Sequence, residues 1–233
     1  MIADNIAEIR TRMDAAARRV SRLPGDITLM AVSKTFSAGD IREAYMAGLR
    51  VFGESRVQEF APKAEAVRDL TDAEFHFIGH LQANKAGKAV ELFRWVDSVD
   101  SLRLAHKLDE AAARGSRRVP VLIEINVGGE EQKSGVAPGS GELEQLLQAA
   151  SSLEHLEFRG LMTVPPYTED PEGARPFFKA LRDLRGVIAA RQMPGICLNV
   201  LSMGMSNDFE VAIEEGATCV RVGSAIFGER PKP

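Results

Sequence analysis

The chain has 233 residues, of which 45% are hydrophobic and 27% are charged, so it can bury a sizeable core without disulfides or metals. Its formal net charge of −4 argues against a protein that binds nucleic acid or an anionic membrane, because both partners need a basic face. Cys197 and Cys219 lie in apolar runs, which favours free thiols in a reducing compartment. We expect a soluble cytoplasmic protein without signal peptide or membrane span.

The chain opens with an amphipathic helix predicted over residues 4–21, which Asp4 or Asn5 can cap. Its apolar stripe recurs at steps of three and four residues and consists of Ile6, Ile9, Met13, Ala16 and Val20. Further along, Ser37 and Ser55 each precede an acidic or amide residue at the spacing of a capping box, so both are expected to cap helices.

Eight runs of strand length follow the first helix, and a helical pattern separates each successive pair. The runs cover residues 27–33, 51–53, 75–79, 94–99, 119–127, 157–164, 196–201 and 218–222. Such alternation implies parallel strands. Eight βα units in a chain of this size predict a single closed (β/α)₈ barrel of the TIM type, with an open doubly wound sheet as the alternative. No helix is expected after the eighth strand, so the first helix can fill that place in the outer ring.

A lysine follows the first predicted strand at the end of the barrel where ligands bind, the carboxyl ends of the strands. Lys34 stands one residue beyond Ser33. One interpretation is a rim lysine whose stem lies on apolar surface while its amine reaches water. The other is an amine whose pKa falls through burial, so that it can form a Schiff base.

Two small polar turns follow the seventh and eighth strands, where barrels of this type commonly hold a phosphate. The first contains Ser202 and Met203 and ends at Ser206, and the second begins with Gly223 and Ser224. Glycine lets backbone N–H groups approach an anion, and serine adds hydroxyl donors. Taken singly, each turn also has a purely structural interpretation. The first would be a helix cap provided by Ser206, and the second would be a C-terminal turn.

Arg221 lies within the eighth strand, and by strand alternation it faces the barrel interior if Cys219 does. A charge there needs a partner, which can be a carboxylate on the rim or an acceptor atom of a ligand. Lys34, the two turns and Arg221 together match the phosphate ester of an aromatic aldehyde. Pyridoxal 5′-phosphate (PLP) fits this description, with Arg221 at the pyridine nitrogen.

Two other motifs are weaker candidates. His76 and His80 are four residues apart on a predicted strand, without a third metal ligand nearby, so we predict no metal site. The stretch GGEEQKSG has part of the pattern of a phosphate-binding loop, but Gln132 replaces a required glycine and two glutamates would repel phosphate. We expect no nucleotide site there.

Seven stretches carry a resemblance to a known family, in the order AVSKTF, FGESRVQE, FHFIGHLQANK, EINVGGEEQKSG, RGLMTVPP, LSMGMSNDFEVAIEEG and VRVGSAIFGER. With these motifs the chain resembles the pyridoxal-phosphate homeostasis proteins, whose barrel is similar to the N-terminal domain of bacterial alanine racemases. The resemblance spans nearly the whole chain. It implies one PLP-binding barrel domain over residues 1–233, of the kind called fold type III.

The resemblance also implies roles for individual residues. Lys34 would carry PLP as a Schiff base, an aldimine, and Arg221 would lie near the ring nitrogen. The phosphate would be held by Ser202, Met203, Gly223 and Ser224. Ser55 stands where the family usually has asparagine, so it is a further cofactor-binding candidate whose ring contact does not carry over, and a helix cap is its default role.

The sequence favours a PLP-binding protein without catalytic turnover over an enzyme. Arginine, unlike aspartate, leaves the pyridine nitrogen unprotonated, which makes the ring a weaker electron sink. A racemase needs a second base, which in the racemases is a tyrosine. Of the two tyrosines in this chain, Tyr45 falls on an outer helix, so only Tyr167 lies in a loop from which it can reach the mouth. The family implies a monomer that maintains PLP (vitamin B6) balance, with PLP-dependent apoenzymes as recipients. A racemase-like enzyme and a cofactor-free Schiff-base aldolase are the alternatives.

Overall fold

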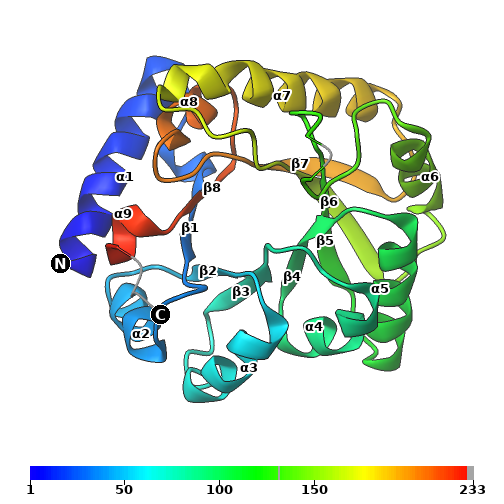
Figure 1. The fold of residues 1–233 in the computed structure, drawn as a ribbon, viewed down its shortest axis with the longest axis horizontal. Coiled ribbons are helices and arrows are strands. Elements are labelled where there is room, and N and C mark those ends of the chain that lie inside the picture. The colour runs from blue at the N-terminus through cyan, green and yellow to red at the C-terminus, as the bar shows by residue number, and fades with distance from the viewer. Residues whose placement is uncertain (131, 230–233) are drawn as a thin grey trace.

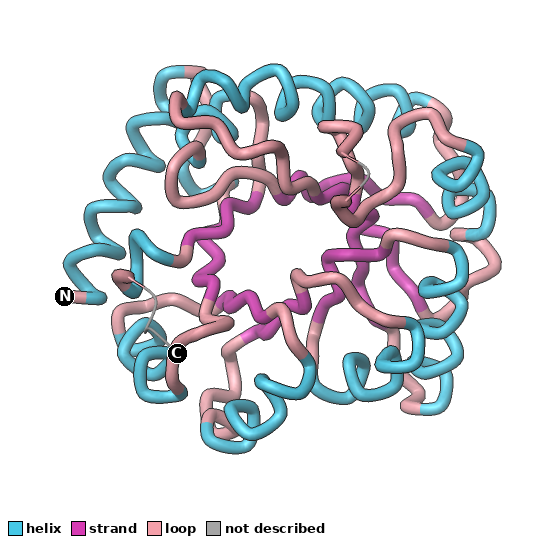
Figure 2. The backbone as a smooth tube through the Cα atoms, viewed as in Figure 1, coloured by secondary structure: helices cyan, strands magenta, loops and turns pink. Residues whose placement is uncertain are grey.

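The chain folds into a closed barrel of eight parallel strands surrounded by helices, in a computed structural model that describes residues 1–130 and 132–229. Glu131, one of the two loop glutamates, therefore lies outside the described residues. The strands follow one another around the barrel in chain order, and β8 pairs with β1 to close it. The strands form the inner ring and the helices the outer ring (Figures 1 and 2). The predicted barrel is confirmed, and the open doubly wound sheet is wrong.

The eight strands lie within three residues of their predicted bounds. They are β1 Thr28–Val32, β2 Val51–Glu54, β3 Glu74–Phe77, β4 Trp95–Val99, β5 Val119–Glu124, β6 Leu156–Met162, β7 Ile196–Ser202 and β8 Cys219–Val222. The α-helices are α1 Ile2–Arg19, α2 Ala38–Met46, α3 Val57–Ala66, α4 Ala86–Leu92, α5 Leu102–Arg114, α6 Gly141–Ala149, α7 Arg175–Ala190, α8 Phe209–Glu214 and α9 Ser224–Phe227. Short 3₁₀ turns cover Pro24–Asp26, Ala83–Lys85 and Pro171–Ala174. None of the described helices is both long and apolar enough to cross a membrane.

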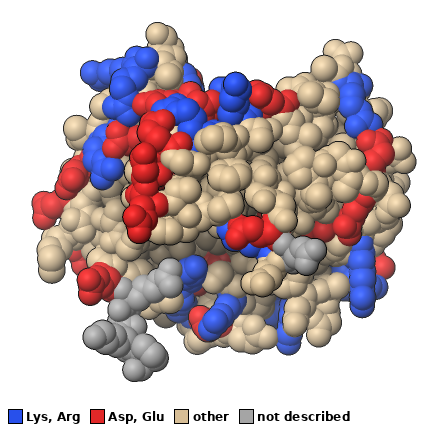
Figure 3. Space-filling model, turned by 45° about the horizontal axis from the view of Figure 1, so that its top comes forward, with Lys and Arg blue, Asp and Glu red and all other residues tan. Residues whose placement is uncertain are grey.

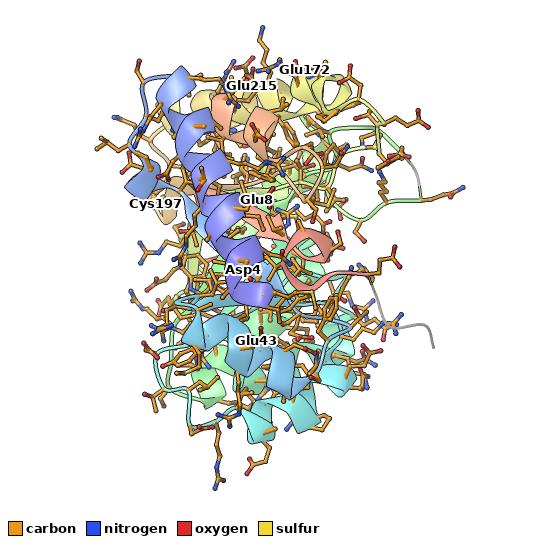
Figure 4. The ribbon with its side chains drawn as sticks, turned by 90° about the vertical axis from the view of Figure 1, so that its left-hand side faces the viewer. Asp4, Glu8, Glu43, Glu172, Cys197 and Glu215 are labelled. Carbon is orange, nitrogen blue, oxygen red and sulfur yellow. The ribbon has the colours of Figure 1, made fainter. Side chains whose placement is uncertain are left out.

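Helix α1 completes the outer ring, as predicted, by packing between α8 and α2 (Figure 4). Two details differ from the prediction. The helix begins at Ile2, and neither Asp4 nor Asn5 caps it. Instead the Asn5 side-chain amide donates to the Ile226 carbonyl at 2.8 Å. That carbonyl belongs to α9, a single helical turn after β8 that was not expected, because four residues are too few to show helical periodicity.

The two predicted helix caps have different outcomes. Ser37 caps α2 in a capping box, because its hydroxyl accepts from the Asp40 N–H while the Asp40 carboxylate accepts from the Ser37 N–H. The prediction that Ser55 caps α3 is wrong, because that helix begins at Val57 with Arg56 as its cap residue. Ser55 instead packs against Gly79, where an added Cβ would lie 2.4 Å from the Ser55 carbonyl oxygen. It therefore continues β2 into the barrel mouth.

Charged side chains tie the helices of the outer ring together near α7 and α8. The Arg175 guanidinium pairs with Glu172, Glu214 and Glu215, the last two at 2.7 and 2.9 Å. From α1, Arg19 also reaches Glu214, at 2.6 Å. Basic and acidic side chains are interleaved rather than segregated on the face that Figure 3 shows, and Figure 4 labels Glu172 and Glu215. These pairs join α1, α7 and α8 side by side, and because the arginines remain partly exposed each pair adds only modestly to the stability of the fold.

Candidate cofactor site

Strand pairing brings the turn after β1 beside the turn after β8. Met30 pairs with Arg221, so Val32 and Gly223 lie at corresponding heights. A Cβ added at Gly223 would meet Val32 at 3.4 Å, an ordinary van der Waals distance, so the two turns lie in contact. Just beyond, the rings of Phe36 and Phe227 stack with centroids 4.7 Å apart. Lys34, which is half-buried, therefore leaves β1 next to the turn predicted to hold phosphate.

The turns after β7 and β8 converge on one oxygen atom. The Ser206 hydroxyl accepts from the backbone N–H groups of Gly223 at 3.3 Å and Ala225 at 3.4 Å, and lies 3.2 Å from the Ser224 hydroxyl. Donors aimed at one point are what a phosphate oxygen requires. The alternative interpretation, a helix cap provided by Ser206, is wrong, since α8 begins at Phe209 with Asp208 as its cap residue. The Asp208 carboxylate accepts from the Met205 N–H. Ser206, which the sequence placed in the predicted phosphate turn but not among the ligands, is thus a further site candidate.

A glycine allows the turn after β7 to approach the turn after β8. Gly204 has a positive φ of 93°, and an added Cβ would lie 2.5 Å from the Ala212 Cβ. Its carbonyl accepts from the Arg221 N–H at 2.9 Å, which fixes this turn to β8. Only glycine meets both requirements at this position.

Arg221 is a buried cation on the inner wall, only 4% exposed. Its guanidinium donates to the Ser202 hydroxyl at 2.8 Å and to the Thr163 carbonyl at 2.7 Å. Within the described part of the chain no carboxylate forms an ion pair with Arg221. The predicted alternative, a partner carboxylate on the rim, is therefore wrong. Burial lowers the pKa of Arg221, while the charges of Asp97 and Glu124 act in the opposite direction.

Ser202 and Met203 lie deeper than the two turns. The Ser202 hydroxyl is engaged by Arg221, and its carbonyl accepts from the Thr163 N–H at 3.1 Å. The Met203 side chain is fully buried, and its N–H donates to the Cys219 carbonyl at 3.1 Å. These contacts fix the end of β7 between β6 and β8, beside the Arg221 side chain. A phosphate contact from either residue stays a prediction.

Glu124 is a second group that the sequence missed, although an acidic residue within the apolar run VPVLIEINV is a signal. It is 7% exposed and lies in register with Met162 and Ser202 on the inner wall. Its Oε2 atom has no hydrogen-bond partner among the described residues. Burial and the charge of Asp100 raise the pKa of Glu124 to about 7, against the effect of Arg221. This carboxyl can therefore gain or lose a proton near neutral pH.

The two histidines contact different carboxylates, and in the described ranges no group of three or more His, Cys, Asp or Glu side chains gathers that could hold a metal ion. His76 faces the opposite end of the barrel, where it lines a cavity of about 460 Å³ with Trp95 and Asp97. Its Nδ1 lies 3.1 Å from Asp97, and its ring stacks on Trp95. His80 instead contacts Asp100 at 3.0 Å.

The His76–Asp97 pair predicts a pH-dependent stability. Burial lowers the pKa of His76, but Asp97 and Glu74 outweigh it and raise the pKa from 6.5 to about 9. A raised folded-state pKa means that the contribution is complete below pH 6.5 and is lost as the pH rises to about 9. We expect the free energy of unfolding to fall by up to about 3 kcal/mol over that range. Denaturant titrations should show this slope in the wild type and in His106→Gln, an exposed control, and lose it in His76→Gln.

The closed parallel barrel ringed by helices is similar in fold to the alanine racemase N-terminal domain. The family model for that domain matches residues 2–231. A pyridoxal phosphate homeostasis protein from Aquifex aeolicus is 44% identical over 97% of this chain and 97% of its own length. The chain therefore belongs to the pyridoxal phosphate homeostasis protein family.

Solved structures agree with this assignment. PipY of Synechococcus elongatus, solved with PLP bound, is 38% identical with a TM-score of 0.84, covering 98% of this chain and all of PipY. The alanine racemase of Corynebacterium glutamicum is 22% identical with a TM-score of 0.69, and the match covers 97% of this chain and 62% of the racemase. The second similarity extends to the fold alone.

Proposed function

We propose that the whole chain is a single PLP-binding barrel domain that binds PLP through Lys34 and takes part in cytoplasmic PLP homeostasis. The observation that carries the proposal is the adjacency of the Lys34 turn and the Gly223 turn, fixed by the pairing of β1 with β8. This adjacency supports a site in which the Lys34 amine and the donors of the Gly223 turn bind the same ligand. The family membership and the PLP-bound PipY structure support the same cofactor.

The residues present fit the chemistry of this cofactor. When bound, PLP supplies a reactive aldehyde, which the Lys34 amine can hold covalently. The N–H groups of Gly223 and Ala225, with the hydroxyls of Ser206 and Ser224, can bind the phosphate. Arg221, oriented by Ser202, provides a fixed cation for the ring nitrogen. We keep Met203 and Ser55 as neighbours of the site rather than as assigned ligands.

We infer a carrier without catalytic turnover. A guanidinium at the ring nitrogen does not protonate it, which disfavours carbanion chemistry. Neither tyrosine offers a positioned second base, because the Tyr45 hydroxyl contacts Asp72 and Tyr167 is 79% exposed. A carrier would keep the aldehyde of PLP from reacting with other amines, and it would pass the cofactor to apoenzymes. We further propose that it acts as a monomer.

One observation favours a racemase-like activity as the second candidate, namely the Glu124 carboxyl whose pKa of about 7 suits proton transfer. Exchange of the amino-acid Cα proton in deuterium oxide separates the two functions. A carrier leaves exchange of alanine at the rate given by free PLP. Faster exchange that falls to that rate in Glu124→Gln would establish the enzyme instead.

Replacing Arg221 with methionine, which keeps the volume, is expected to weaken PLP retention by about 10- to 100-fold, because one charge-assisted contact is lost. Covalent attachment at saturating PLP should persist, since Lys34 is untouched. Equilibrium dialysis measures retention, and Arg56→Met is the control because Arg56 is exposed beside the mouth. Unchanged retention would make Arg221 a residue that serves only the fold.

A further inference from the structure

The turn that carries Lys34 is held from outside by a second lysine. The Lys63 ammonium, on α3, donates to the carbonyl oxygens of Ser33 at 3.0 Å and Phe36 at 3.3 Å, and the Lys34 carbonyl oxygen lies 3.4 Å from its Nζ atom. An ammonium has three N–H donors in a compact group, so it can serve several carbonyls that point at one place. These carbonyls belong to the turn between β1 and α2, whose backbone is closed by a hydrogen bond from the Phe36 N–H to the Ser33 carbonyl at 3.0 Å.

A buried carboxylate holds this ammonium in place. Glu54, at the end of β2, is fully buried, and its Oε1 accepts from Lys63 Nζ at 2.7 Å. The same oxygen accepts from the Ser33 hydroxyl, also at 2.7 Å. Burial raises the pKa of Glu54, and the hydrogen bonds and charge of Lys63 oppose that rise. The Lys63 side chain is only 15% exposed, so water screens the pair weakly.

The arrangement connects two neighbouring βα units of the barrel. Ser33 belongs to the turn after β1, Glu54 ends β2, and Lys63 lies on α3. The Ser33 N–H already donates to the Gly53 carbonyl at 3.0 Å, which ties the start of the turn to β2. The Lys63–Glu54 pair adds a side-chain restraint on the backbone of Lys34, whose carbonyl oxygen faces the ammonium.

We propose that Lys63, oriented by Glu54, is a positioning residue for covalent capture of PLP: it fixes the turn over residues 33–36 so that the Lys34 amine meets the aldehyde. This inference rests on the proposed function. It differs from a merely structural role, because it assigns to Lys63 an effect on the covalent step and none on binding of the phosphate and ring.

The test compares two cofactor forms on the full chain. Pyridoxine 5′-phosphate has the ring and phosphate but no aldehyde, so it reports reversible binding alone. PLP reports the rate of attachment to Lys34, followed by absorbance after mixing. In Lys63→Met we expect that rate to fall about tenfold or more, because a misplaced amine loses alignment with the aldehyde. Affinity for pyridoxine 5′-phosphate should stay within about twofold.

Matched variants make the result specific. Lys88→Met removes an exposed lysine that pairs with Glu91 at 2.6 Å on α4, and should leave both measurements unchanged. Lys63→Arg, which keeps the charge and several donors, should recover part of the rate. An unchanged attachment rate in Lys63→Met, or an equal loss in both measurements, overturns the proposal.

Two further comparisons apply if Lys63→Met does not fold or if the proposed function itself is wrong. If Lys63→Met does not fold, Glu54→Gln replaces it, since it removes the charge that orients the ammonium, and the same slowed attachment is expected. An unchanged rate in Glu54→Gln then overturns the proposal. A wild-type chain that binds pyridoxine 5′-phosphate but never attaches PLP at Lys34 would overturn the proposed function itself, and this inference with it.

Discussion

Replacing Lys34 with alanine is expected to abolish covalent attachment of PLP completely while reversible binding persists. The reason is that attachment requires an amine at this turn, whereas the proposed phosphate donors Ser206, Gly223 and Ala225 lie in or after the turns that follow β7 and β8. Attachment is measured as the mass increment that remains after borohydride reduction and denaturation. Reversible binding is measured as affinity for pyridoxine 5′-phosphate, which we expect to change by no more than about threefold, or about 0.6 kcal/mol.

The matched control for this variant is Lys85→Ala. Lys85 is half-buried and lines the small cavity beside Ser55 and His80, so it is another lysine close to the mouth. Its variant should attach PLP as the wild type does. Persistent attachment in Lys34→Ala, or its loss in Lys85→Ala, would mean that the covalent site was assigned to the wrong lysine.

Replacing Gly160 with alanine is expected to cost more than about 3 kcal/mol of the free energy of unfolding, because the inner wall has no room for a methyl group. Gly160 lies on β6, where the pairing with β7 shifts register. An added Cβ would lie 1.9 Å from the Val200 carbonyl oxygen and 2.7 Å from its carbon. Backbone atoms cannot move aside as a flexible side chain can, so the strands would have to separate.

Gly186→Ala is the control for this prediction. Gly186 lies within α7, where an added Cβ meets nothing within 4 Å. Alanine there should stabilise the protein by up to about 1 kcal/mol, because glycine is a poor helix former. Urea titrations of both variants measure the difference. Equal stability of Gly160→Ala and the wild type would show that β6 and β7 are farther apart than described.

The sequence predicted the barrel because its signals are local and repeated. Each strand is a short apolar run, and each helix has an apolar stripe, so eight units could be counted without knowing any long-range contact. Lys34 and Arg221 were found by the same means, since each charge stands at or within such a run. Helix α9 escaped because a single turn carries no period.

Several site features depend on contacts between βα units, which the sequence alone does not show. Ser206 meets the N–H groups of Gly223 and Ala225 only after β7 and β8 are aligned. In the sequence, Lys63 is one of several charged residues on a predicted outer helix. Only the fold brings its ammonium into contact with the Ser33 carbonyl of the Lys34 turn. For Ser55, the capping-box pattern was present, but the strand extended one residue further than predicted and the helix began later.

Peptide mapping of the wild-type chain tests the central claim most directly. The protein is mixed with PLP, reduced with borohydride, digested and analysed by mass spectrometry. We predict one modified peptide, the one that contains Lys34, at one cofactor per chain. A reduced adduct on any other lysine, or a chain that stays unmodified at saturating PLP, would contradict the account.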